Sequence, residues 1–139
     1  MFTSVSTRSA SAYKRASVEA SVDMADPHQL VNLLFEALQR SIGSAKLHMQ
    51  SGDVPNKCTQ IGNAVRILEE GLRAPLDLEK GGEIAANLNS VYEYCVTKLV
   101  LANARNDMAA LEEVQRLIEP IASGWKQIEG RGPAYLRPV

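Results

Sequence analysis

The side chains that could carry chemistry in this chain are two histidines, two cysteines and several adjacent acidic pairs. Helical bundles that hold a di-metal centre use repeated Glu-x-x-His patterns, but neither His28 nor His48 has a glutamate three residues before it. Cys58 and Cys95 stand alone, so the paired cysteines of a zinc site and the C-x-x-C-H pattern of haem attachment are missing. The sequence predicts no metal and no cofactor, with solvated histidines and buried, reduced thiols.

The patterns of common catalytic and phosphate sites are also missing. Gly81-Gly82 precedes a helical segment, but no strand comes before it and no Lys-Ser/Thr follows, as a phosphate-binding loop requires. The acidic pairs Glu69-Glu70 and Glu112-Glu113 are sequence neighbours, which splay about 100° apart on a helix. We therefore expect these acids to form a solvated face, and we expect the protein not to be an enzyme.

Length and composition restrict the class of protein further. The chain has 139 residues, 45% of them apolar and 22% charged, which suits one domain with a real core. A formal net charge of −1 argues against a general nucleic-acid binder, whose surface would be basic. No apolar run approaches the roughly 18–20 residues of a membrane helix, and no signal-peptide core is seen near the start. We expect a cytoplasmic protein that binds no nucleic acid and does not insert into membranes.

Four segments with helical periodicity occupy the centre of the chain. Asp26, Pro27 and Gln29 form a capping-box pattern at the start of the first, which ends at Gly52-Asp53. The second runs from about residue 53 to Ala74, and the third from about 83 to 104 after a connector whose hinge is Gly81-Gly82. Asn106 or Asp107 caps the fourth, and a kink is expected at Pro120. Each segment carries an apolar seam at steps of three and four. The seam of the first is Val31, Phe35, Leu38, Ile42, Ala45 and Met49, and that of the fourth is Leu111, Val114, Ile118, Ile121, Trp125 and Ile128.

Short connections place consecutive helices antiparallel. The predicted fold is all-α, an antiparallel up-and-down four-helix bundle over residues 26–129. Serine-rich residues 1–25 are predicted to form a mobile N-terminal arm with one short additional helical turn, and residues 130–139, rich in Gly and Pro, a disordered tail.

A second apolar stripe lies beside these seams on the first two helices. Its members are Leu30, Leu33, Ala37, Ala64, Ile67 and Gly71. One interpretation is that they widen the core or pack against the arm; the other is that they form a groove for helices of a partner, with small residues allowing close approach. The two interpretations are compatible if the arm, anchored by Tyr13, covers the stripe in the free protein and a partner then displaces it. Tyr94 lies just off the seam of the third helix, where core-edge packing and partner binding both suit a tyrosine.

Several blocks along the chain together resemble the FliS family of flagellin-specific export chaperones. Near the start these are Ala12-Tyr13-Lys14, then Asp26-Pro27 where the family more usually has Ser-Pro, and LVNLLFE at 30–36. The middle block includes Gly81-Gly82-Glu83-Ile84-Ala85, Asn87-Leu88, Tyr92 and Tyr94, and the last includes Ala102-Asn103, Asn106-Asp107, Glu113-Val114 and Trp125. The resemblance covers about residues 12–128. Pro120 and the tail after Gly130 depart from the family pattern.

This resemblance implies a non-enzymatic cytoplasmic chaperone of bacterial flagellum biogenesis. Family members bind the disordered C-terminal segment of newly made flagellin, prevent premature polymerisation and hold the subunit for type III export. Loaded chaperones also engage the cytoplasmic domain of the flagellar export gate. The resemblance links the Tyr13 region to the arm and to downstream recognition.

A second hypothesis comes from another functional class. The same helical surface would suit a regulatory adaptor that binds an anti-sigma factor, a co-chaperone or another soluble flagellar regulator. Partner identity separates the two hypotheses, because only the first requires tight binding of a flagellin C-terminal peptide.

Overall fold

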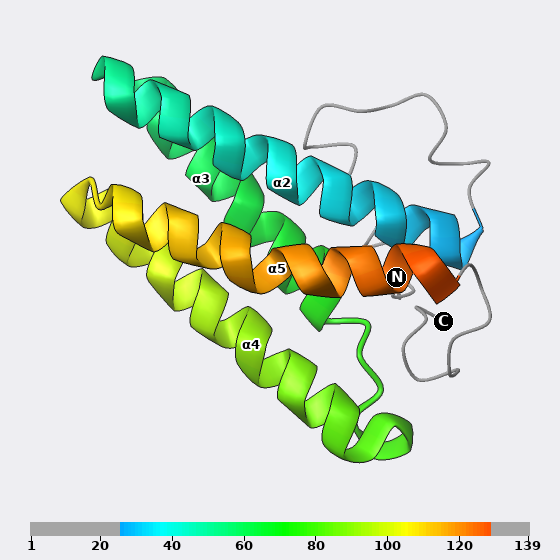
Figure 1. The fold of residues 1–139 in the computed structure, drawn as a ribbon. Helices are drawn as coiled ribbons and strands as arrows, with labels where there is room; N and C mark the ends of the chain where they lie inside the picture. The colour runs from blue at the N-terminus through cyan, green and yellow to red at the C-terminus, as the bar shows by residue number, and fades with distance from the viewer. Residues whose placement is uncertain (1–25, 129–139) are drawn as a thin grey trace, which may run out of the picture.

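A computed structural model describes residues 26–128 as antiparallel helices, with no strand in that range. The helices are α2 (Pro27–Ser51), α3 (Val54–Arg66) continued by a π-helix, η2 (Ile67–Arg73), then α4 (Leu78–Arg105) and α5 (Met108–Ile128) (Figure 1). The predicted four-helix bundle is therefore confirmed. The predicted arm with its extra turn, Tyr13 and the C-terminal tail lie outside the described residues.

Local sequence explains both ends of α2. The Asp26 side chain accepts a hydrogen bond from the Gln29 backbone N–H at 2.7 Å, and the Gln29 side chain accepts from the Asp26 backbone N–H at 3.3 Å. This reciprocal pair is the predicted capping box. At the other end Gly52 has φ 77°, the left-handed conformation that glycine adopts most readily.

The second helix changes its hydrogen-bonding pattern in its last two turns. Asp53 caps α3 by accepting from the Asn56 backbone N–H, close to the predicted start of the helix. From Ile67 the ladder widens to a π-helix, in which the Ala74 N–H donates to the Glu69 carbonyl five residues back. Sequence periodicity did not predict this change, because propensities do not distinguish a π-turn from an α-turn.

The third helix begins earlier than expected. The Asp77 side chain accepts from the Lys80 backbone N–H, so a first turn forms from Leu78 onward, before the predicted start near Glu83. Gly82 interrupts it with φ 53° and ψ −130°, a backbone conformation suited to glycine. The predicted hinge is therefore a break inside α4 rather than part of a connector.

In the turn between α4 and α5, one residue ends the first helix and the next residue caps the second. Asn106 is left-handed, with φ 51°, and ends α4, whereas Asp107 accepts from the Ala110 backbone N–H and caps α5. Pro120 lies inside α5, as the sequence predicts. It cannot donate the backbone hydrogen bond of its position, so the helix is weakened there.

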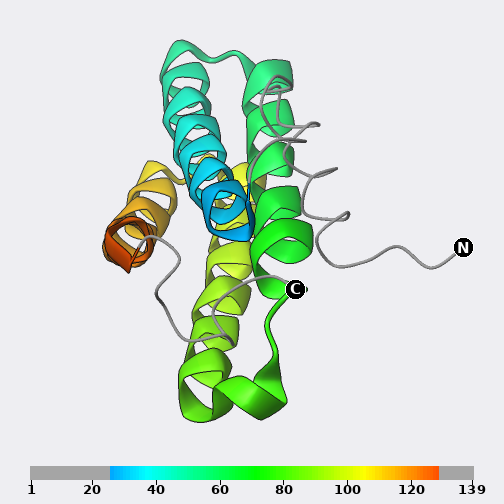
Figure 2. The ribbon, with the colours of Figure 1, turned by 90° about the vertical axis from the view of Figure 1, so that its right-hand side faces the viewer.

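The bundle has a ring-like arrangement in which α2 packs on α3 and α5, and α4 packs on α5 and on α3 with η2. Figures 1 and 2 show that α4 and α5 leave their shared turn close together and diverge toward the end where α2 begins. The predicted seams supply most of the core, whose fully buried large side chains include Leu34, Leu38, Ile42, Ile61, Leu68, Leu99, Leu111 and Ile118.

Two sequence expectations about single residues were wrong. His28, in the first turn of α2, is buried and not solvated, because its ring packs against Trp125 near the end of α5. Cys58 is exposed on α3, whereas Cys95 is buried as expected, and both thiols are free. Burial raises the pKa of the Cys95 thiol to about 11, so this thiol stays protonated at neutral pH.

Candidate functional site

An apolar groove opens at the end of the bundle where α4 and α5 diverge. Its cavity measures about 300 Å³. Residues from all the helical elements except α3 line it, together with the connector between η2 and α4. They are Val31, Phe35, Gly71, Leu72, Pro75, Leu76, Ile84, Leu88, Tyr92, Pro120, Ile121, Gly124, Trp125 and Ile128.

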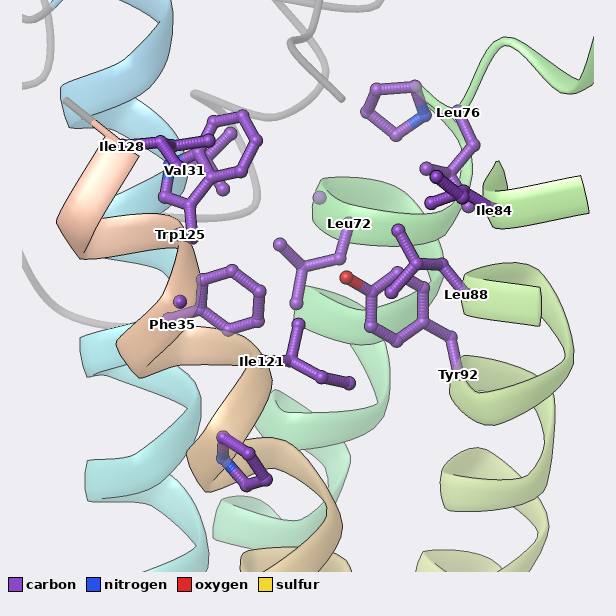
Figure 3. A pocket seen from close by; sticks show the side chains of 14 residues that line it. Val31, Phe35, Leu72, Leu76, Ile84, Leu88, Tyr92, Ile121, Trp125 and Ile128 are labelled. Carbon is purple, nitrogen blue, oxygen red and sulfur yellow. The ribbon is translucent and has the colours of Figure 1, made fainter. Parts of the chain in front are cut away.

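The groove has two facing walls and a floor (Figure 3). Trp125 and Ile128 of α5 stand with Val31 of α2 on one side, opposite Ile84 and the rest of the α4 wall. Leu72 of η2 lies between the walls and forms the floor of the groove. Trp125 is 7% exposed while Ile84 is 49% exposed, so the α4 wall carries much of the uncovered apolar surface. An apolar side chain of a partner would complete this packing.

Close packing beneath the groove depends on a glycine. A Cβ at Gly71 would lie 3.1 and 3.2 Å from the two terminal methyl carbons of Leu34, closer than ordinary van der Waals contact. The absence of a side chain lets η2 lie against α2 while its neighbour Leu72 lines the groove. This explains why a residue without a side chain stands next to Leu72 at this point.

A polar cluster holds η2 against α4 beside the groove. The Arg73 guanidinium donates to the Asn89 side chain at 2.8 Å, to Glu69 at 3.0 Å and to Glu93. These contacts join the end of η2 to two successive turns of α4. Because Leu72 and the connector adjoin Arg73 in sequence, the cluster helps to set the spacing between the floor and the α4 wall.

The groove offers almost nothing for acid–base chemistry. Tyr92 supplies the one titratable side chain among the lining residues, and burial raises its pKa well above the ordinary value. The phenol is therefore neutral, and Figure 3 shows its hydroxyl directed toward Leu72. Such a surface can take up apolar side chains but has no candidate nucleophile or proton carrier.

The structure places most of the second apolar stripe away from this groove. Leu30, Ala37, Ala64 and Ile67 are buried in the core, and Leu33 is partly buried against it. Their burial favours the interpretation that they widen the core. Of the stripe residues, Gly71 lines the groove. A predicted role of the stripe in partner binding stays a prediction, and Ile67→Asp would now be expected to disrupt folding rather than test binding, because Ile67 is fully buried.

Tyr94 lies on the outer surface of α4, away from the groove lining. Its hydroxyl donates to the Glu113 carboxylate of α5, and the Lys98 ammonium lies 3.2 Å from the same carboxylate. The hydrogen bond raises the pKa of Tyr94 and lowers that of Glu113. With 44% of its surface exposed, Tyr94 joins α4 to α5 and remains accessible, so both interpretations of it stay open.

The groove residues were visible in the sequence, but as core. Val31, Phe35, Ile121, Trp125 and Ile128 all belong to predicted seams. Nothing in a single-helix pattern distinguishes a seam that is closed by a neighbour from one that stays open. Two residues did indicate that the packing changes at this end of the bundle. Pro75 ends the second helix, and Gly82 breaks the third.

Other kinds of site find no support in the part of the chain that the structure describes. Over residues 26–128, no group of three or more His, Cys, Asp or Glu side chains could hold a metal ion. None of the described helices is long and apolar enough to cross a membrane.

Comparison with known proteins gives a consistent result. Residues 9–132 match the family model described as flagellar protein FliS. The chain is 46% identical over 117 residues to the flagellar secretion chaperone FliS of Salmonella typhimurium, covering 84% of this chain and 87% of that protein. It is 41% identical over 116 residues to the flagellar secretion chaperone FliSB of Pseudomonas aeruginosa, covering 84% and 91%. With FliS of Bacillus subtilis the identity is 28% over 107 residues, covering 77% and 78%.

Proposed function

This chain belongs to the FliS family of flagellar proteins, and on that premise we propose that it is a cytoplasmic export chaperone for flagellin. It binds the disordered C-terminal segment of flagellin, keeps the subunit from polymerising and delivers it to the cytoplasmic domain of the flagellar export gate. Its relatives carry the name flagellar secretion chaperone, which supports the export role. The observation that supports binding is the apolar groove.

The chemistry of the groove suits an amphipathic segment. Its lining is apolar apart from one neutral phenol and the Trp125 indole, so binding must come chiefly from burial of apolar side chains. Terminal segments of flagellin that polymerise through apolar helical faces present such side chains. A chaperone that covers those faces blocks assembly without nucleotide.

Coupled folding explains how such a complex can be both extensive and releasable. A disordered segment that becomes helical on binding loses conformational entropy, and this loss offsets part of the free energy gained from burial. The net affinity is therefore lower than the buried area suggests. Release at the export gate then requires the loss of only part of the contact surface.

The direct experiment is calorimetric titration of the full chain with a peptide covering the last ~40–50 residues of the same organism's flagellin, a length suited to a segment that wraps a large surface. Far-UV circular dichroism is followed on the same mixture. We expect one-to-one binding, a negative heat-capacity change and a gain in helix. Failure of the folded protein to bind would refute the flagellin proposal and favour the adaptor for a soluble regulator such as an anti-sigma factor.

Two matched variants test whether the groove is where the segment binds. Ile84 and Val100 are both β-branched residues of α4, 49% and 54% exposed, but Ile84 lines the groove and Val100 does not. Full burial of such a side chain contributes ~1.5–3 kcal/mol, so the half of Ile84 left for a partner to cover is worth ~1 kcal/mol, and a carboxylate placed there adds a desolvation cost. We expect Ile84→Glu to weaken binding more than tenfold and Val100→Glu to leave it nearly unchanged. Equal effects would place the contact elsewhere.

A further inference from the structure

A reciprocal pair of hydrogen bonds joins the two ends of the described chain beside the groove. The His28 Nε2–H donates to the Trp125 backbone carbonyl at 2.7 Å, and the Trp125 indole N–H donates to the His28 backbone carbonyl at 3.0 Å. The two rings stack with centroids 5.0 Å apart and an interplanar angle of 21°. Both residues are more than nine-tenths buried. We refer to this arrangement as the His28–Trp125 clasp.

The clasp ties a backbone group of α5 to a side chain of α2. Trp125 lies in the last described turn of α5, and its carbonyl accepts from the His28 imidazole. Since a carbonyl oxygen can only accept, Nε2 carries the proton in this contact.

The part of α5 that the clasp holds is also the part that forms the groove wall. Pro120 removes one backbone hydrogen bond from α5, and Ile121, Gly124, Trp125 and Ile128 all follow it and line the groove. The wall therefore consists of the last two turns of a helix that is weakened at their base. Packing against α2 and the clasp hold these turns in place.

We infer that His28 is a positioning residue of the groove: it holds Trp125, and through Trp125 the α5 wall, at the separation that a bound segment requires. His28 itself does not line the groove. Any effect of His28 on binding must therefore pass through the wall. The identity of the ligand in this inference rests on the proposed function, but the mechanical role of His28 does not.

Trp125 is the one tryptophan of the chain, so its fluorescence reports the clasp directly. In His28→Leu we expect emission at longer wavelength and stronger quenching by acrylamide, because the indole loses the imidazole ring stacked against it and keeps only its own bond to the backbone carbonyl of residue 28. We expect binding of the flagellin peptide to weaken about three- to tenfold, the effect of a lost hydrogen bond. His28→Gln, whose amide can donate to the same carbonyl, should restore both properties in large part.

Lys57→Met is the matched control. Lys57 is also buried and also donates to a carbonyl in the last turn of a helix, that of Asn103 in α4, at the opposite end of the bundle. A general loss of stability would weaken peptide binding equally in His28→Leu and Lys57→Met, and that result would overturn the inference. If His28→Leu does not fold, His28→Asn takes its place, because the shorter amide stops short of the Trp125 oxygen.

The outcomes separate this inference from the proposed function. If the wild-type protein binds the peptide and His28→Leu binds it as tightly, with unchanged quenching, the positioning role is refuted and the proposed function stands. If the wild-type protein does not bind the peptide, the proposed function fails. The positioning role is then decided with the apolar dye 1-anilinonaphthalene-8-sulfonate: a change in Trp125 quenching and dye binding specific to His28→Leu supports it, and the absence of both refutes it.

Discussion

Replacement of Lys57 by methionine tests how the far end of the bundle is held together. Lys57 is 3% exposed, and its ammonium donates to the Asn103 carbonyl at 2.9 Å and to the Asn106 side-chain oxygen at 2.6 Å. The Asp107 N–H bonds to Ala102 instead of Asn103. Lys57 thus donates to the Asn103 carbonyl, which has no such bond from Asp107, and it stabilises the left-handed conformation of Asn106, the residue that ends α4.

Two opposing effects determine the sign of the change. Methionine keeps a long apolar stem but leaves two acceptors without this donor, and hydrogen bonds to a charged group contribute ~1.5–3 kcal/mol each. A cation near the C-terminus of a helix adds ~0.3–1 kcal/mol. Against this, removing a buried ammonium abolishes a desolvation penalty of several kcal/mol. We expect a net loss of about 1–2 kcal/mol in the free energy of unfolding, which lowers Tm by roughly 4–8 °C.

Urea denaturation at pH 7, followed by circular dichroism, measures this loss as a lower midpoint with an unchanged m-value. Lys46→Met is the control, because the Lys46 side chain is 25% exposed and bonds to side chains rather than to a helix end. A change below ~0.5 kcal/mol is expected there. If Lys57→Met were as stable as the wild type or more so, desolvation would outweigh the capping bonds and this account of Lys57 would be wrong.

Three further results are expected. Gly71→Ala should lower the free energy of unfolding by about 0.5–2 kcal/mol in urea denaturation, because crowding of buried Leu34 by the new methyl group, which destabilises by about 1–3 kcal/mol, outweighs the helix propensity gained from alanine, about 0.5–1 kcal/mol. Exposed Cys58 should react with Ellman's reagent in the folded protein at pH 8, whereas buried Cys95, with its pKa raised to about 11, should react only on unfolding; two fast thiols would contradict the burial. The hydrogen bond from Tyr94 lowers the pKa of Glu113 in the folded state, so its stabilising effect is present above the carboxyl's unfolded pKa and is lost as pH falls through the folded value. Urea midpoints of Tyr94→Phe and wild type should therefore converge between pH 7 and about 3, and a constant difference would show that the carboxylate is not involved.

The sequence determined the helices because their ends are encoded locally. A capping box needs only Asp26 and Gln29 at fixed spacing, and a left-handed end needs only Gly52. Apolar steps of three and four then identify the face that each helix buries. The blocks that resemble the FliS family are likewise continuous stretches, so the family could be identified from the sequence, and the comparisons confirm it.

The candidate site depended on distances between helices, which periodicity does not encode. Phe35 and Ile121 have the same spacing signature as fully buried seam residues, yet they line an open groove because α4 diverges from α5 at that end. The second stripe shows the converse, since its pattern allowed either a wider core or a groove for a partner, and Ala64 and Ile67 are enclosed in the core. An apolar pattern reports which face is buried and not how far away the partner helix lies.

The sequence by itself determined the class of protein, the four helices and the absence of any recognisable catalytic or metal-binding motif, because each rests on composition or on residues a few positions apart. Only the tertiary structure decided where the groove opens, that η2 is a π-helix, and that His28 is paired with Trp125. The two residues are 97 positions apart in the chain, and the hydrogen bonds between them exist only because packing of α2 against α5 brings the two buried rings together.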